Sequence, residues 1–293
     1  MVLTGRAAHR RAAASETIAA RHYRLKLIAD LTYEVIPLKS LDAAVEALPA
    51  GARVSVTASP VKGQDATCEI TERLLDAGHE AIPHVSARLV PDRVRVSELA
   101  AWLRNTGVST MFLVGGDADP PGAYSDAATF LRDLLECDHG LTTIGVTAYP
   151  HGHPLISDDV LHEALHAKQA LLADAGLAGY CSTQMCFDPD RIERWLRAER
   201  SAGLTLPVHL GISGVVDRAK LLTMGARLGV GPSLRYLRKN RAAVTKLMTS
   251  PSYDPDQLLT ALSPHLAELE VTGLHTFTFN QVAATAAWQA SHS

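Results

Sequence analysis

The stretch Ser109-Thr-Met-Phe-Leu-Val-Gly-Gly-Asp-Ala-Asp-Pro-Pro-Gly122 decides the fold expected for this chain. It opens with an apolar, β-branched and aromatic run of strand length, which two glycines, an acid and two prolines then interrupt. A continuous apolar run is typical of a strand buried on both faces of a parallel sheet. In parallel α/β proteins, ligands bind at the carboxyl end of such strands. We therefore expect Asp117 to belong to a binding or active site.

Similar strand segments recur along the 293-residue chain, each followed by a helical segment of roughly 10 to 18 residues. Strands are expected over residues 31–36, 53–57, 80–84, from 109 onward, 141–149, 178–184, 206–211 and 273–279. About eight strand–helix units without a change in composition predict a single-domain (β/α)8 TIM barrel. A doubly wound open sheet is the alternative. It requires a Gly-rich phosphate loop after the first strand, and Glu34-Val-Ile-Pro-Leu-Lys39 contains none.

An additional helix is expected before the first strand, from about Ala13 to Ile28. We therefore divide the chain into an N-terminal helical extension, residues 1–29, and a barrel domain, residues 30–293. The first 30 residues are rich in Arg, Ala and Ser, a composition similar to that of organelle transit peptides. An amphipathic helix explains the same composition, and a cytoplasmic protein is the expectation.

Composition excludes several classes of protein. A formal net charge of -3 gives no electrostatic basis for binding nucleic acid or an acidic membrane surface. No apolar run approaches the roughly 18 residues that a membrane span needs. The 4 cysteines form no C-x-x-C pair, so reduced thiols are expected. The sequence carries no signal for an oligomeric state.

The last residues of the expected strands, most of them polar, all face one mouth in a barrel. These residues are Glu34, Thr57, His84, Asp117, Tyr149 with His153, Gln184, Gly211, and Phe279 with Asn280. Such a set in an apolar funnel is costly to assemble without a ligand. Glu34 is flanked by Tyr33, Val35 and Ile36, surroundings that disfavour its charged form and suit a general acid.

The order and spacing of short motifs from about Tyr33 to Asn280 resemble the 5,10-methylenetetrahydrofolate reductases. The motifs are Tyr33-Glu34 before Pro37, Val54-Ser-Val-Thr57, Pro83-His84, Gly116-Asp117 with Pro120-Pro121, Ala148-Tyr-Pro150 with His153-Pro154, Thr183-Gln184, Phe187-Asp188, Pro207, Gly211-Ile212, Gly273-Leu-His275 and Asn280. The resemblance implies a (β/α)8 barrel that reduces methylenetetrahydrofolate to 5-methyltetrahydrofolate with NADH or NADPH, usually through FAD. A folate and a nicotinamide dinucleotide are thus the expected partners.

The resemblance also assigns roles to residues. Glu34 is similar to the general acid that protonates N10 and opens the ring to the 5-iminium ion, so Glu34 and Asp117 are the expected catalytic residues. Asp117 and Gln184 match residues that hold the pterin, with Thr57 and Phe279 also expected to contact the substrate. Positions similar to those of the flavin pocket are Thr57, His84, Gly116, Tyr149, His153 and Lys168.

The chain departs from the family at several positions that hold the cofactor. Gly115 replaces an arginine, His151 a glutamate and Gln281 another arginine. Ala164 and Ala167 fall where polar residues grip FAD, and no aromatic residue for the nicotinamide stands near Val216-Asp217. FAD binding is therefore left open, and we hypothesise that flavin is bound weakly or not at all, with hydride passing directly from NAD(P)H to the folate.

Rival interpretations remain. A barrel that binds folate or a nucleotide without turnover is one, and one-carbon demethylation in the reverse direction is another. His162-Glu-Ala-Leu-His166 matches the H-E-x-x-H signature of zinc hydrolases, with Glu163 as its acid, but we identify no third ligand downstream and expect no metal. The basic segment Arg235–Lys246 is expected to be a solvated helix face or to attract an anionic folate tail or pyrophosphate.

Overall fold

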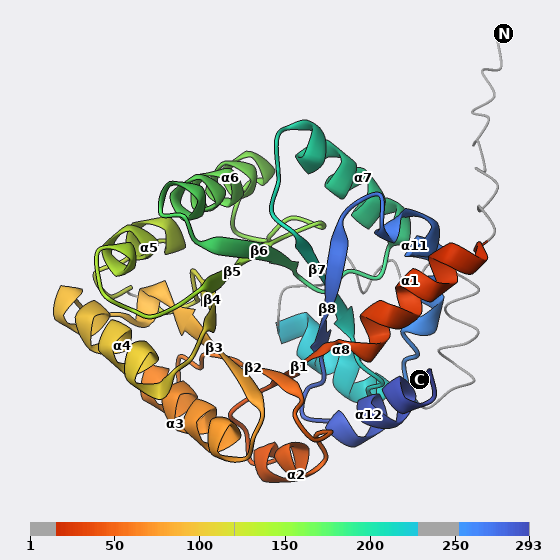
Figure 1. Cartoon of the computed structure of the whole chain (residues 1–293), viewed down its shortest axis with the longest axis horizontal. Helices are drawn as coiled ribbons and strands as arrows, with labels where there is room; N and C mark the ends of the chain where they lie inside the picture. Colours follow the sequence, from red (N-terminus) through yellow and green to blue (C-terminus); the bar gives the residue numbers. More distant parts are fainter. Residues whose placement is uncertain (1–15, 120, 228–251, 293) are drawn as a thin grey trace, which may run out of the picture.

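The computed structural model describes residues 16–119, 121–227 and 252–292. Its eight strands pair in chain order, all in parallel, and β1 also pairs with β8 to close the barrel (Figure 1). The strands are β1 (Thr32–Val35), β2 (Arg53–Val56), β3 (Glu80–Ser86), β4 (Thr110–Val114), β5 (Thr143–Ala148), β6 (Ala178–Thr183), β7 (Val208–Ser213) and β8 (Val271–Phe277). The structure thus confirms the predicted (β/α)8 barrel, and the doubly wound alternative is wrong.

The helices surround the strands as an outer ring (Figure 1). They are α1 (Ile18–Ala29), α2 (Leu41–Glu46), α3 (Gly63–Asp76), α4 (Arg93–Thr106), α5 (Ala127–Leu135), α6 (Asp158–Asp174), α7 (Pro189–Ser201), α8 (Arg218–Arg227), α11 (Asp256–Leu266) and α12 (Val282–Ala290). N-capping side chains fix where α4, α6 and α7 begin. Asp92, Ser157 and Asp188 each accept a hydrogen bond from a backbone N–H in the first turn of the helix that follows. The basic segment 235–246 lies outside the described residues.

The predicted N-terminal helix exists as α1, which packs against α11 and also contacts β8 and α12. Leu27 and Ile28 are buried in the main apolar core, and the Tyr23 hydroxyl donates a hydrogen bond to the Val271 carbonyl of β8. The helix therefore shares a core with the barrel. The division between residues 1–29 and 30–293 stays a prediction.

Large side chains fill the inside of the barrel, and glycines make room for them. Ile82, Phe112 and Tyr180 form a buried cluster of inward-facing side chains. A Cβ placed on Gly145 of β5 would lie 2.4 Å from Tyr180 and 2.5 Å from Phe112. Only glycine fits at this position, as expected for a filled barrel centre.

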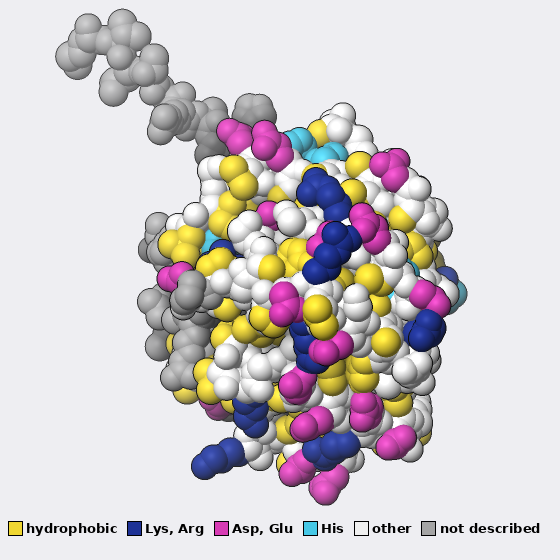
Figure 2. All heavy atoms as spheres, turned by 90° about the vertical axis from the view of Figure 1, so that its left-hand side faces the viewer, with side chains coloured by type: hydrophobic (Ala, Val, Ile, Leu, Met, Phe, Trp, Pro, Cys, Tyr) yellow, Lys and Arg dark blue, Asp and Glu magenta, His cyan; other side chains and the backbone are white. Residues whose placement is uncertain are grey.

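The outer surface carries mixed charge. Figure 2 shows the side of the molecule that bears α4 and α5, where acidic and basic side chains are interspersed with apolar ones. Ion pairs on this side include Arg95 with Glu98 and Arg104 with Asp138. Among the described helices, none is long and apolar enough to cross a membrane.

Candidate functional site

A cavity of about 470 Å³ opens at the carboxyl ends of the barrel strands. It brings together most of the predicted site residues, namely Glu34, Thr57, His84, Gly116, Asp117, Tyr149, His153 and Gln184. These residues are far apart in sequence and meet because every strand of a parallel barrel ends at the same face. The cavity is within the size range of small-molecule sites.

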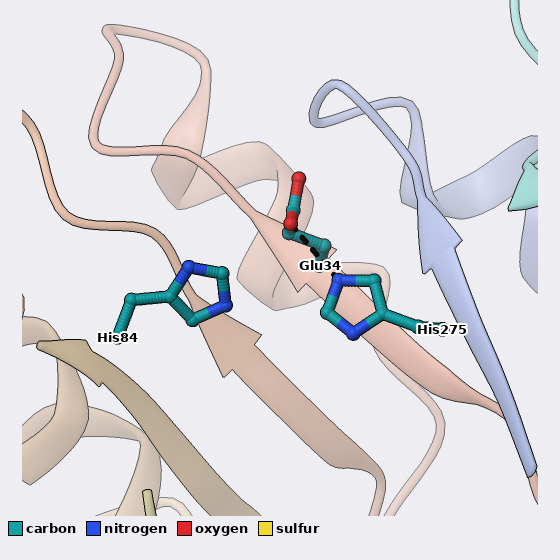
Figure 3. Close-up of side chains that lie close together, drawn as sticks. All are labelled: Glu34, His84 and His275. Atoms are coloured by element: carbon teal, nitrogen blue, oxygen red, sulfur yellow. Dashed lines mark hydrogen bonds and ion pairs between the residues drawn. The ribbon is translucent and has the colours of Figure 1, made fainter. Parts of the chain in front are cut away.

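Glu34 of β1 lines this cavity and is only 5% exposed. Its Oε2 is 2.9 Å from Nε2 of His275, which comes from the neighbouring strand β8 (Figure 3). His275 is itself only 3% exposed. The main chain at Glu34 is also fixed, because the Thr278 hydroxyl donates a hydrogen bond to its carbonyl oxygen. The pair places a carboxyl group and an imidazole, both able to carry a proton, in one buried contact.

His84 of β3 faces the same pair from the opposite side (Figure 3). Its Nε2 lies 2.6 Å from the Ser55 hydroxyl, and its ring centroid is 6.0 Å from that of His275. Burial, with a smaller contribution from the charge of His275, holds the pKa of His84 well below its ordinary value. His84 is therefore a neutral imidazole at neutral pH, able to hydrogen-bond a ligand without adding charge.

A hydrogen-bonded side chain from α3 fixes the end of β3. The Gln64 amide donates to the His84 carbonyl at 2.7 Å and accepts from the Ser86 backbone N–H at 3.2 Å. Gln64 is 6% exposed, so these bonds are sheltered from water. The orientation of His84 is thus set from behind by a residue outside the cavity lining.

One donor atom from each of Glu34, His84 and His275 lies within 4.8 Å of the other two, a spacing that raises the question of a metal. Donors on one zinc ion stand about 3.3 Å apart. Here only Glu34 and His275 are hydrogen-bonded to each other, and Nε2 of His84 lies 2.6 Å from the Ser55 hydroxyl, which is outside the group, so the three side chains do not converge on one atom. The arrangement fits a hydrogen-bonded acid and imidazole better than a metal centre.

Two buried hydroxyl groups of the cavity have no hydrogen-bond partner among the described residues: Thr57 Oγ1 and Ser86 Oγ. Buried polar atoms in folded proteins are nearly always paired, so unpaired ones in a cavity indicate a ligand. Gly116 passes close to Ser86, with φ at +90° and a position where an added Cβ would lie 1.9 Å from Ser86 Oγ. Glycine at position 116 therefore leaves room for this hydroxyl at the cavity wall.

The rim of the cavity is more polar. Asp117 is exposed in the loop after β4, as its position after the apolar run predicts. Burial raises the pKa of the Tyr149 phenol, and the negative charge of Asp117 adds to the rise. The Tyr149 ring meets His153 edge-on, with centroids 5.6 Å apart. The rim thus offers a carboxylate, a protonated phenol and an imidazole to a polar heterocycle.

Four residues expected at the site or the barrel mouth do not line the cavity: Lys168, Phe279, Gly211 and Asn280. Lys168 is buried behind the wall, with Nζ 3.5 Å from the Thr147 hydroxyl, and burial lowers its pKa to about 8. Phe279 is fully buried in an apolar cluster that also contains Tyr253 and Phe277, and it does not reach the cavity. Strand β8 ends at Phe277, and Phe279 follows it with φ at +48°, so the alternation of the strand does not extend to 279. Phe277 takes the lining position instead.

His275 is the main residue that the sequence analysis missed as a site residue, and Ser86, Phe112 and Phe277 were missed too. Side chains of a strand alternate between its two faces. On β8 the residues Gly273, His275 and Phe277 share one face, so extending the inward face back from the strand end would have found them.

The cavity fits a tightly held flavin dinucleotide poorly. At Gly115, where the resemblance described above predicts an arginine, an added Cβ would meet no atom within 4 Å, so the space is open. The lining formed by described residues contains no lysine or arginine, although a pyrophosphate favours such cations or helix N-termini. The described residues offer partners for a neutral heterocycle and no anchor for FAD phosphates.

The H-E-x-x-H segment lies on α6, in the outer ring of helices. Its two histidines contact Glu199 of α7, so the expectation that no third ligand stands nearby was wrong. Glu163, the acid that a hydrolase would need, is exposed. It lines neither the barrel cavity nor the smaller cavity beside His162 and Glu199. The geometry therefore gives no support to a zinc hydrolase.

Fold and site together define a (β/α)8 barrel whose ligand cavity, with a buried acid–imidazole pair, lies at the carboxyl ends of its strands. The sequence model of one family, methylenetetrahydrofolate reductase, matches residues 38–287. The chain belongs to the methylenetetrahydrofolate reductase family, as the motifs predicted.

The solved structures that match this chain have low sequence identity to it. Tryptophan synthase from M. tuberculosis is 18% identical, with 84% of this chain and 99% of that chain covered and a TM-score of 0.41. A 2,3-dimethylmalate lyase of the PEP mutase/isocitrate lyase superfamily is 12% identical, with 87% and 96% covered and a TM-score of 0.42.

Proposed function

We propose that this protein reduces 5,10-methylenetetrahydrofolate to 5-methyltetrahydrofolate with NADH or NADPH as the hydride donor. The observation that carries the proposal is the buried pair of Glu34 and His275, 2.9 Å apart in the cavity of a chain that belongs to the reductase family. The overall reaction consumes one NAD(P)H and one proton, and it releases NAD(P)⁺. The protein must therefore supply a proton at one atom and admit hydride at another.

Glu34 supplies the proton. Its carboxyl group protonates N10 of the folate, the bond between N10 and the methylene carbon breaks, and the bonding electrons stay on N10. The product is the 5-iminium ion. Because Glu34 is buried and touches His275, the pair can hold one transferable proton out of contact with bulk water. Hydride then adds to the exocyclic carbon and gives the methyl group.

The remaining lining residues bind and orient the folate. Asp117 at the rim and Gln184 hold the pterin, and the Asp117 carboxylate favours the positive charge that develops on the iminium ion. The unpaired hydroxyls of Thr57 and Ser86 and the neutral ring of His84 are available to its nitrogen and oxygen atoms. Phe112 and Phe277 supply the apolar walls of the cavity.

The hydride passes directly from the nicotinamide to the iminium carbon, with flavin bound weakly or not at all. The open space at Gly115 and the absence of lysine and arginine from the described lining support this part of the proposal. The test is the absorbance of the purified protein near about 450 nm, where bound flavin absorbs. A stoichiometric flavin band would overturn it. Gly115→Arg, which restores the family's cation, is expected to increase the affinity for added FAD.

The reaction itself is tested by NAD(P)H oxidation in the presence of methylenetetrahydrofolate, with and without added FAD. Glu34→Gln is expected to lower turnover by roughly 10²–10⁴-fold, the usual contribution of a general acid. Glu46→Gln, a matched change at an exposed position of α2, serves as the control and should be neutral. If Glu34→Gln kept the turnover of the parent protein, Glu34 would not be the acid.

A folate- or nucleotide-binding barrel without turnover is the second candidate, because the open space at Gly115 leaves a cofactor contact of the family unmade. It predicts that the parent protein binds folate and oxidises no NAD(P)H. The direction of the reaction is a separate question. NADH formation from 5-methyltetrahydrofolate with NAD⁺ would favour the demethylating direction.

A further inference from the structure

A second cluster of metal-binding side chains lies outside the barrel cavity, between α6 and α7. His162 and His166 are four residues apart on α6, which puts both rings on one face of the helix, with centroids 4.4 Å apart. Glu199 of α7 points one carboxylate oxygen, Oε2, at both rings, 2.8 Å from Nδ1 of His162 and 2.9 Å from Nε2 of His166. One donor atom from each residue lies within 4.8 Å of the others.

We propose that His162, His166 and Glu199 bind a divalent transition-metal ion of the zinc type that joins α6 to α7. Two imidazole nitrogens and one carboxylate oxygen form a ligand set that suits Zn²⁺ and, less selectively, Co²⁺ or Ni²⁺, whereas Mg²⁺ favours oxygen ligands. Small rotations of the side chains bring the three donors to the spacing of about 3.3 Å that a tetrahedral zinc ion requires.

Burial distinguishes this cluster from a chance surface contact. The side chain of Glu199 is only 8% exposed, so a carboxylate is held away from water between two helices. A buried carboxylate is stable only when paired, and a doubly charged ion compensates its charge more fully than hydrogen bonds to two imidazole rings do. The side chain of His162 is 43% exposed, which gives an ion a path from solvent.

A fourth ligand position is also available. A cavity of about 200 Å³ adjoins the cluster and is lined by His162, Glu199, Asp158, Asp159 and Arg191 among others. Its volume accommodates several water molecules, each of which occupies about 30 Å³ in the liquid. A water molecule there would complete a tetrahedral site. Glu163, the acid that the H-E-x-x-H motif would use as a general base, does not line this cavity, and we assign the site no hydrolytic chemistry.

The position of the site suggests what the ion does. Ala148 and Tyr149 line both this cavity and the larger barrel cavity. An ion that fixes α6 against α7 would therefore stiffen the wall that carries Tyr149. The expected effect is on stability, and the site does not depend on the proposed reduction.

The test uses the full chain, treated with EDTA and then dialysed against buffered Zn²⁺. We expect about one equivalent of Zn²⁺ to remain bound and the Tm to rise by roughly 3–8 °C at saturation. Co²⁺ should give the intense visible absorption of a four-coordinate site, and Mg²⁺ should change nothing. His166→Asn and Glu199→Gln should abolish both effects.

Glu163→Gln is the matched control, since it alters the same five-residue motif at the residue that the proposal leaves free of metal. It should bind Zn²⁺ as the parent protein does. His162→Asn, at the partly exposed position, provides a second ligand variant if a change at buried Glu199 prevents folding. A parent protein that retains no Zn²⁺, or equal binding by His166→Asn and Glu163→Gln, would overturn the site. Either result leaves the reduction assay unaffected, because none of the three ligands lines the barrel cavity.

Discussion

At the scale of single residues, the contact between Glu34 and His275 joins positions 241 residues apart in the sequence. Glu34 could be predicted because its apolar neighbours within one strand mark it as a buried acid. His275 could have been placed on the inward face of its strand, but its contact with Glu34 could not be predicted, since the two residues lie at opposite ends of the chain. Closure of the barrel between β1 and β8 creates the pair.

His275→Asn tests whether the imidazole positions the acid. Asparagine keeps a hydrogen-bond donor of similar size but carries no transferable proton. We expect kcat to fall by roughly 10–100-fold, with KM for methylenetetrahydrofolate changed less than about 3-fold, because binding contacts remain. The pH at which kcat declines should also move. An unchanged pH profile with a lower kcat would indicate a structural role only.

Gly116 and Gly115 form a natural pair for a stability experiment. Gly116→Ala puts a side chain at φ +90° and a Cβ 1.9 Å from Ser86 Oγ, whereas Gly115→Ala meets nothing within 4 Å. The first change is expected to cost roughly 2–5 kcal/mol of unfolding free energy and the second less than about 0.5 kcal/mol. Urea unfolding measures both. Equal costs would mean that the loop rearranges freely.

At the scale of elements, the sequence predicted the existence of each strand correctly but placed the ends of several strands wrongly. The seventh strand was expected at 206–211 and lies at Val208–Ser213, and the eighth was expected at 273–279 and lies at Val271–Phe277. Periodicity reveals that a strand exists, but its ends depend on backbone geometry such as the positive φ of Phe279 and Asn280. The misplacement of Phe279 in the site follows from this error.

Helix α6 carries Lys168, whose ammonium group is buried at 5% exposure. Burial lowers its pKa from 10.5 to about 8. Between these two values the unfolded chain binds the proton and the folded chain does not, so this group makes stability rise with pH there. Lys168→Met should therefore be more stable than the parent by roughly 2–3 kcal/mol at pH 7, and the difference should vanish as the pH rises toward about 10.5.

The measurement for Lys168 is the difference in unfolding free energy between the two proteins across the pH range, which cancels the titration of all other groups. Lys26→Met on the exposed face of α1 is the control and should show no such dependence. A constant difference from pH 7 to about 10.5 would contradict a depressed pKa at Lys168.

At the scale of the whole molecule, the order of short motifs predicted both the barrel and the family. Each strand–helix unit contributes its own strand end to the mouth, so local patterns were enough to collect Glu34, His84 and Asp117 at one site. Contacts between outer helices follow no such rule. Glu199 reaches His162 and His166 only because α6 and α7 are neighbours in the ring, and the sequence gives no sign of where their side chains meet.

Deletion of the N-terminal helix would measure how much the extension contributes to the stability of the barrel. Deletion of residues 1–29 removes Leu27 and Ile28, 5% and 0% exposed, from the shared core. Burial of two such side chains contributes about 3–6 kcal/mol, so the shortened chain should lose most of its stability or fail to fold. Thermal unfolding is the measurement.

Tyr23→Phe, which removes only the hydrogen bond to Val271, should lower the free energy of unfolding by about 0.5–1.5 kcal/mol. If the shortened chain had the Tm of the parent protein, the contacts of α1 with α11 and β8 would contribute nothing to the stability of the barrel. The N-terminal extension would then be a separate unit, and the barrel would be stable with its own helices alone.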